Sequence, residues 1–306
     1  MRWQGAVREA VTRTLAAERR ERDEATFAAV VAQTWQREGR ALWTGRIGVD
    51  EMTRAAAGAL GAALQDLCKN AGCRGWVRVA LPDTIFTLRT LATDEVPAKR
   101  EEARQFLRWQ ARDLLPFPQE EARLDFLTAP AGTDGRPRAT CLMARGRILA
   151  EYEDTLARAG LRAAVLDARS ICLAQAASAP LAQGTTGLLA VGEKRSTLLI
   201  LQGGQPRFWR HLPEGREGWA AGDRTRLLRE VTDSITYSQE SEGWGALQSM
   251  HLTGPRFTAG EVASALGEWL SVPVTALDLG VALGAGGHPD DLLRWGPAIG
   301  AAIRPC

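Results

Sequence analysis

The chain has 306 residues, 45% of them hydrophobic, and its formal net charge at pH 7 is +2. This length allows about two domains, and the composition is typical of a globular protein rather than of a fibrous, disordered or membrane-embedded one. No segment is exclusively basic, so the charge pattern argues against a nucleic-acid-binding protein.

Residues 1–25 are dense in arginine and glutamate. Val7, Val11 and Leu15 are spaced four apart, which predicts an amphipathic helix with a narrow apolar stripe. This helix either caps the following domain or docks on a partner or a membrane surface, and we favour the cap because its arginines and acids nearly balance. No apolar run is long enough for a membrane span or a signal peptide, so we expect a cytoplasmic protein.

Strands and helices are expected to alternate after residue 25. Residues 26–35 and 41–47 predict one strand pair, and the alanine-rich segment 50–70 predicts a helix. Residues 76–81 and 85–91 predict a second strand pair. The opening third of the chain therefore indicates a mixed α/β structure.

A proline corner follows a strongly periodic helix. Residues 99–115 carry apolar side chains at helical spacing, and Pro116 and Pro118 end the helix. Residues 121–127 alternate apolar and polar side chains, which predicts a strand with one buried face. We therefore expect the helix to dock on a sheet through a stiff Pro-Phe-Pro turn.

The rest of the chain continues the alternation. Two strands flank a turn at 132–135, a helix covers 147–159, and residues 178–186 have the composition of a linker. The later expected strands are 188–191, 197–202, 207–212, 250–253 and 272–275, and the later expected helices are 223–242, 258–270 and 295–303.

Several of these segments, in this order, resemble the PilM-like proteins of type IV pilus assembly. The resemblance rests on the proline corner with its Leu-Asp-Phe strand at 124–126, on the Leu-Pro strand end at 81–82 and on the Ala-Gly-Leu turn at 159–161. It extends through the strand at 163–170 and the three strands at 188–213, and covers about residues 26–304.

The resemblance implies a two-lobed actin-like, ribonuclease H-like α/β fold with a ββαββα-like insert in the first half. The implied divisions are the N-terminal helix at 1–25, the first half at 26–75 and 169–184, the insert at 76–168, and the second half at 185–306. The residue pattern alone indicates only a mixed two-domain protein.

Proteins of this fold hold ATP between the halves, and the resemblance implies three loops for it. The first, an Asp-x-Gly turn near the start, is absent, because Asp23 has no following glycine. The second corresponds to residues 191–197, where Val191 replaces an acidic residue. Its candidate phosphate contacts are Gly192, Lys194, Ser196 and Thr197. A plain hairpin with a polar turn fits the same residues, and we favour that interpretation.

The third loop corresponds to Gly254, where the next glycine is replaced by Pro255. Proline removes a backbone donor and fixes φ, which hinders close approach of a nucleotide. We therefore expect no resident cofactor, or weak binding of ATP with Mg²⁺, and we expect no catalytic activity.

Other site chemistry lacks support in the sequence. The cysteines form no CxxC pair and the histidines lie far apart, so we expect no metal site, and no hydrolase or P-loop motif occurs. These residues are Cys68, Cys73, Cys141, Cys172, Cys306, His211, His251 and His288.

The function implied by the resemblance is a cytoplasmic scaffold at the inner face of the inner membrane. It would bind the cytoplasmic N-terminal tail of a PilN-like single-span protein in a groove beside the insert. Candidate anchors are Trp109, Phe117 and Phe126, for each of which ordinary core packing is the competing interpretation. The alternatives are a GspL-like type II secretion component and an ATP-binding switch or phosphotransferase of the same fold.

Overall fold

The computed structural model describes residues 30–33, 44–46, 61–62, 64–66, 68–69, 74–93, 95–129, 135–242, 244–254, 259–284 and 289–303. The expected N-terminal helix at 1–25 lies outside these residues. No helix in the described part is both long enough and apolar enough to cross a bilayer. The described residues fall into two compact units, one within 1–84, 147–179 and 278–306, the other within 85–146 and 180–277.

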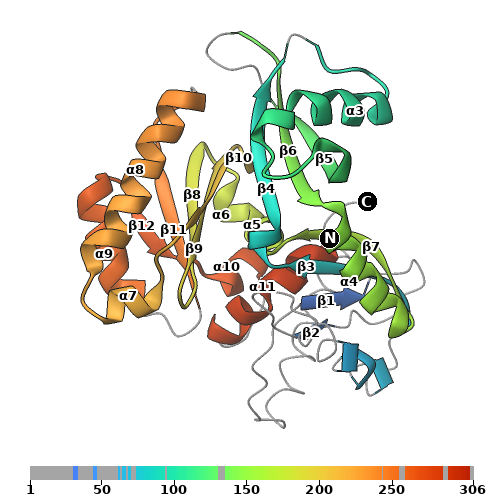
Figure 1. Cartoon of the computed structure of the whole chain (residues 1–306). Coiled ribbons are helices and arrows are strands. Elements are labelled where there is room, and N and C mark those ends of the chain that lie inside the picture. Colours follow the sequence, from blue (N-terminus) through green and yellow to red (C-terminus); the bar gives the residue numbers. More distant parts are fainter. Residues whose placement is uncertain are drawn as a thin grey trace. The chain divides into compact units, whose positions relative to one another are not determined.

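The first unit is built on a four-stranded sheet in the order β2-β1-β3-β7 (Figure 1). Its strands are β1 (Val30–Gln33), β2 (Thr44–Arg46), β3 (Gly75–Leu81) and β7 (Leu161–Ala168). β1 runs antiparallel to both of its neighbours, β2 and β3, whereas β3 and β7 run parallel. Five consecutive residues of β3 are buried, as expected for a central strand that is covered on both faces.

The helices of the first unit include α4 (Gly146–Arg158), α5 (Arg169–Ala176), α10 (Leu279–Leu283) and α11 (Pro289–Ile303). Small side chains on α11 and Cys172 on α5 form a buried cluster with Ala80 of β3. The Arg78 guanidinium donates to the carbonyl of Ala302 (3.3 Å) at the carboxyl end of α11, where a cation is favourable. The C-terminal helix is thereby fixed to the first sheet.

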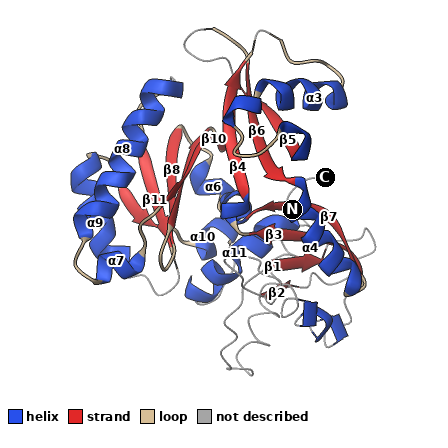
Figure 2. Ribbon diagram, in the orientation of Figure 1, coloured by secondary structure: helices blue, strands red, loops and turns tan. Residues whose placement is uncertain are grey.

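The second unit contains a five-stranded sheet in the order β10-β9-β8-β11-β12. The strands are β8 (Thr185–Val191), β9 (Ser196–Gln202), β10 (Gln205–Leu212), β11 (Ser249–Thr253) and β12 (Val274–Ala276). Antiparallel β8, β9 and β10 form a meander, while β11 runs parallel to both β8 and β12. Apolar faces of α8 (Arg224–Glu242) and α9 (Ala259–Leu270) pack on this sheet (Figure 2).

A three-stranded sheet, in the order β4-β6-β5, completes the second unit. It consists of β4 (Phe86–Ala92), β5 (Ala122–Ala129) and β6 (Arg138–Arg145), and α3 (Arg100–Gln110) packs on it around buried Leu107 and Phe126. The 3-10 turns η2 (Arg112–Leu114) and η3 (Gln119–Glu121) flank the proline corner. The predicted helix, corner and strand are therefore confirmed, although the α-helix ends at Gln110 and the 3-10 turn follows it.

The predicted pairing of residues 76–81 with 85–91 is wrong. β3 pairs with β1 and β7, whereas β4 pairs with β6. The segment between the strands has the length of a hairpin loop, but η1 (Asp83–Ile85) turns the chain into another sheet. The compact units also divide differently from the expected domains, because the insert sheet groups with the second half and residues 278–303 with the first.

Candidate functional site

The loop predicted to contact phosphate is the turn between β8 and β9. The Gly192 amide donates to the Arg195 carbonyl (3.0 Å), which closes the hairpin. Ser196 and Thr197 are buried at the start of β9, and the Ser196 hydroxyl donates to the Glu214 carbonyl (2.6 Å). Lys194 is exposed. Two of the expected phosphate donors therefore bond to the protein itself.

A segment after β10 binds this hairpin from outside. The amides of Arg216 and Glu217, at the start of α7 (Arg216–Ala220), donate to the carbonyls of Gly192 and Glu193, each at 2.9 Å. The Arg216 guanidinium forms an ion pair with the Glu193 carboxylate, and these hydrogen bonds and the opposite charge raise the pKa of Arg216. The start of α7 therefore binds the turn through both backbone hydrogen bonds and a side-chain ion pair.

Gly215 allows this close approach. A Cβ at this position would lie 2.6 Å from the Glu193 carbonyl oxygen and 2.7 Å from that of Gly192. Both are backbone atoms, which have little room to move away. The segment at 214–217 was not predicted from the sequence. The only sign of it there is Gly215, which follows shortly after the expected strand at 207–212.

Gly254, the candidate contact for the adenosine, lies at the same end of the sheet as Gly192. β8 and β11 are adjacent and parallel, with Ala190 opposite Thr253, so each glycine follows the carboxyl end of its strand. Pro255 lies outside the described residues. The topology thus brings together two of the predicted loops at a sheet edge where ligands of α/β proteins often bind. The hydrogen bonds fit a plain hairpin, and a nucleotide role for these residues stays a prediction.

The three candidate partner anchors lie in different environments. Phe126 is buried in the core between α3 and its sheet, with 9% of its surface exposed. Trp109 is 55% exposed, and the Arg112 guanidinium lies over its ring at 4.5 Å from the centroid. Phe117 is half-buried, 5.8 Å from the Arg145 guanidinium. The position of Phe126 favours core packing, whereas Trp109 is accessible to a partner.

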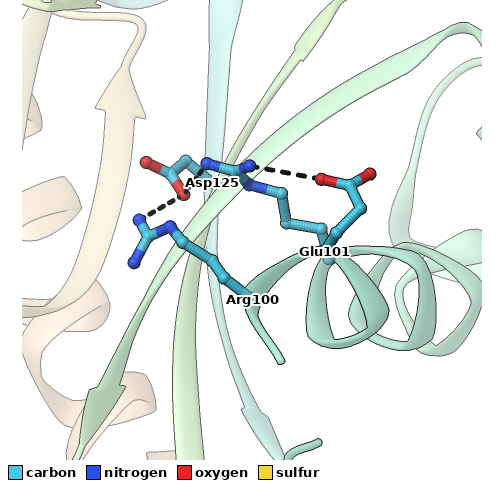
Figure 3. A network of polar contacts seen from close by, with 4 residues as sticks. Arg100, Glu101 and Asp125 are labelled. Carbon is cyan, nitrogen blue, oxygen red and sulfur yellow. Dashed lines mark hydrogen bonds and ion pairs between the residues drawn. The ribbon is translucent and has the colours of Figure 1, made fainter. Parts of the chain in front are cut away.

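Charged groups from α3 and β5 form a network, in which the Arg100 guanidinium lies 5.3 Å from the centroid of the Phe126 ring. The Asp125 Oδ1 atom accepts from Arg100 Nη2 at 2.7 Å and from Arg104 Nη2 at 3.3 Å. Figure 3 shows Asp125 with Arg100 and Glu101 in this network. Arg104 also bonds to Glu101 (3.3 Å). All four side chains are at least one-third exposed, so each pair contributes about 0 to 1 kcal/mol to stability.

The described histidines and cysteines form structural contacts. His211 packs edge-on against Trp209, and His251 bonds to Thr275 (3.1 Å) across β11 and β12. Cys141 is buried, and burial raises its pKa to about 12. Among the residues that the structure describes, no three histidine, cysteine, aspartate or glutamate side chains are grouped to hold a metal ion. Cys73, Cys306 and His288 lie outside them.

Comparison with known proteins gives a fold relationship. No protein-family model matches the chain, and no curated protein matches it significantly. Among solved structures, a chain of the PilM–PilN type IV pilus biogenesis complex superposes with a TM-score of 0.68 at 19% identity. The superposition covers 92% of this chain and 97% of that one.

Weaker similarity extends to two other solved structures. The cytoplasmic domain of EpsL, an inner membrane component of the type II secretion system of Vibrio cholerae, matches with a TM-score of 0.42 and 15% identity, over 72% of this chain and 74% of that one. A Bacteroides thetaiotaomicron protein with an actin-like ATPase fold and unknown function matches with a TM-score of 0.41 and 10% identity, over 78% and 80%.

The sheet topology and the near-complete superposition agree with the fold class expected from the sequence. The chain has a two-lobed, actin-like α/β fold, which it shares over almost its whole length with a chain of the PilM–PilN complex.

Proposed function

We propose that this protein is a PilM-like, non-catalytic component of the inner-membrane platform of a type IV pilus or a related secretion system. The observation that carries the proposal is the superposition on a chain of the PilM–PilN complex, which leaves only a small part of either chain unmatched. The proposed location is the inner face of the inner membrane, where a membrane-spanning partner would hold the protein.

The proposed partner is a PilN-like single-span protein, bound through its short cytoplasmic N-terminal tail. The insert offers Trp109 for such a contact, because this side chain is more than half exposed and is held beside Arg112. Aromatic side chains with a neighbouring arginine are frequent centres of binding energy in protein interfaces. Phe117, half-buried at the proline corner, is the second candidate contact.

Isothermal titration calorimetry with a peptide copying the PilN-like tail tests this proposal. We expect the wild-type protein to bind and Trp109→Ala to weaken binding at least about tenfold, as for an interface hot spot. Trp269→Ala is the matched control, since Trp269 is a similarly exposed tryptophan (45%) on α9. An equal loss in both variants, or no binding by the wild type, would contradict the proposal. A tail from a type II secretion partner that binds instead would identify the GspL-like alternative.

A nucleotide switch or phosphotransferase is the second candidate function. It is favoured by the meeting of the Gly192 and Gly254 turns at one sheet edge, and disfavoured by the hydrogen bonds that tie the first turn to residues 214–217. Titration with ATP and Mg²⁺ separates the two functions. Tight binding that is lost in Lys194→Ala would establish a working phosphate loop, whereas the scaffold proposal expects no such binding.

A further inference from the structure

The outer edge of β5 is an unpaired sheet edge in the part of the chain that the structure describes. β5 pairs with β6 along all eight of its residues, and the other outer strand, β4, is joined to β10 through the bond from the Thr90 hydroxyl to the Arg207 carbonyl (2.7 Å). An eight-residue strand with one open side presents a row of backbone donors and acceptors to another strand. The edge therefore fits an extended segment of protein.

The sequence of β5 is complementary to itself in the antiparallel direction. If two copies of the strand pair with Leu124 opposite Leu124, then Arg123 of each copy faces Asp125 of the other. Ala122 then faces Phe126, which places a small side chain beside a large one. Opposite charges that face one another directly across an antiparallel pair are stabilising, whereas like charges are destabilising.

The exposure pattern of β5 agrees with this pairing. Arg123, Asp125 and Leu127 are exposed and project from one face, while Ala122 and Phe126 are buried on the face that α3 covers. The charged pairs would therefore form on the open face. Arg100 and Arg104 already contact Asp125, but these exposed ion pairs are weak and leave the second carboxylate oxygen for a further donor.

We propose that the β5 edge is a self-association surface through which two copies of this chain pair antiparallel about Leu124. The result is a two-fold symmetric, six-stranded sheet in the order β4-β6-β5-β5-β6-β4. Two-fold symmetry follows because the same residues serve on both sides of the contact. One strand pair is a small interface, so the dimer is weak and depends on protein concentration.

Two charge-reversal variants test the pairing and its register by sedimentation velocity. Arg123→Asp leaves only acidic side chains at the facing positions, and Asp125→Arg leaves only basic ones. Each variant alone is expected to raise the dimer dissociation constant about tenfold, through loss of two attractive pairs and gain of two repulsive ones. Mixed in equal amounts, the variants place Asp opposite Arg at both positions, and dimers are expected to return. Arg229→Asp, an equal charge change at an exposed position of α8, is expected to dimerise as the wild type does.

Four outcomes would overturn the inference, and the first three concern self-association. These are a wild-type protein that stays monomeric up to its solubility limit, a dimer insensitive to both reversals, and variants whose mixture fails to associate. A monomer whose β5 amides become protected from hydrogen exchange when the tail peptide is added would also overturn it, and would assign the edge to the partner instead. Circular dichroism of each variant shows whether the chain keeps its secondary structure, and a folded variant is required for each comparison.

Discussion

Gly300 on α11 lies directly against the backbone carbonyl of Cys172 on α5. An added Cβ at Gly300 would lie 1.6 Å from the Cys172 oxygen and 2.4 Å from its carbonyl carbon, distances that no side-chain rearrangement can relieve. Gly296, one turn earlier, is enclosed by Leu173 and Leu279, each 2.6 Å from its would-be Cβ. The C-terminal helix thus packs on α5 through glycines four residues apart.

Replacing Gly300 with alanine is expected to destabilise the first unit by about 3 kcal/mol, because the two helices must separate to admit the methyl group. Equilibrium urea unfolding measures the change. Gly260→Ala is the matched control: it lies in α9 with nothing within 4 Å of its would-be Cβ, so alanine is expected to stabilise by about 0.5 to 1 kcal/mol. Equal effects of the two substitutions would show that the α5–α11 contact is looser than described.

The bond between Thr90 and Arg207 joins the insert sheet to the five-stranded sheet. Arg207 lies where the β9–β10 register shifts, and its carbonyl accepts from the Thr90 hydroxyl at 2.7 Å. Thr90→Val keeps the shape of the side chain but removes the donor, which is expected to cost about 1 kcal/mol. Hydrogen exchange of the β4 and β10 amides should accelerate in this variant. Thr87→Val, about 10 Å away on the same strand, should leave the exchange of the β10 amides unchanged. If the β10 amides exchange faster in both variants, the cause is a general loosening of β4 and not the loss of the bond to Arg207.

The individual elements of the second half could be predicted because their signals are local. Three of its strands are bounded by turns, and β9 and β10 are joined through Gly203 and Gly204, both with positive φ. In α8, which matches the expected helix at 223–242, the apolar residues Leu227, Leu228, Val231 and Ile235 recur at helical spacing and all four side chains are buried. The spacing of apolar residues and the residue types of the turns are therefore enough to predict the structure where consecutive elements pair with each other.

The partner of β4 could not be predicted, since strand pairing across long separations depends on tertiary packing and leaves no local signal. The same limit applies to the candidate site. The polar turn at Gly192 was identifiable from its composition, but the amides of Arg216 and Glu217 that bind it lie at the start of α7, after the end of β10. A phosphate loop and a hairpin tied by a later segment have the same local sequence, and only the later segment distinguishes them.

The free energy of unfolding of alanine variants distinguishes an aromatic side chain in the core from one on the surface. Phe126→Ala is expected to cost about 3 to 5 kcal/mol, because it empties the core between α3 and its sheet. Trp109→Ala is expected to cost about 1 kcal/mol or less, mainly through loss of the contact with Arg112. Thermal unfolding of both variants measures the difference. Under the proposed function, Trp109→Ala would then lose tail binding while remaining folded, and a large loss of stability in this variant would instead place Trp109 in the core.

The stability of the five-stranded sheet is expected to depend on the protonation of His251. Burial lowers the pKa of this imidazole below its ordinary value of 6.5, so the folded protein favours the neutral ring. In the unfolded chain the ring takes up a proton as the pH falls through 6.5, before the folded protein does so. The stabilising contribution of the neutral ring is therefore complete above pH 6.5 and is lost as the pH falls from 6.5 to the lowered folded pKa.

Urea unfolding between pH 7.5 and pH 5 should show this loss, and His251→Asn should flatten the slope across that interval. Asn supplies a polar group for the Thr275 hydroxyl, which bonds to His251 Nδ1 at 3.1 Å, but it does not titrate. Carboxylates contribute their own slope at the acidic end, so the comparison is made between the two proteins at each pH. If the wild type and the variant have parallel profiles from pH 7.5 to pH 5, His251 does not govern acid sensitivity in this sheet.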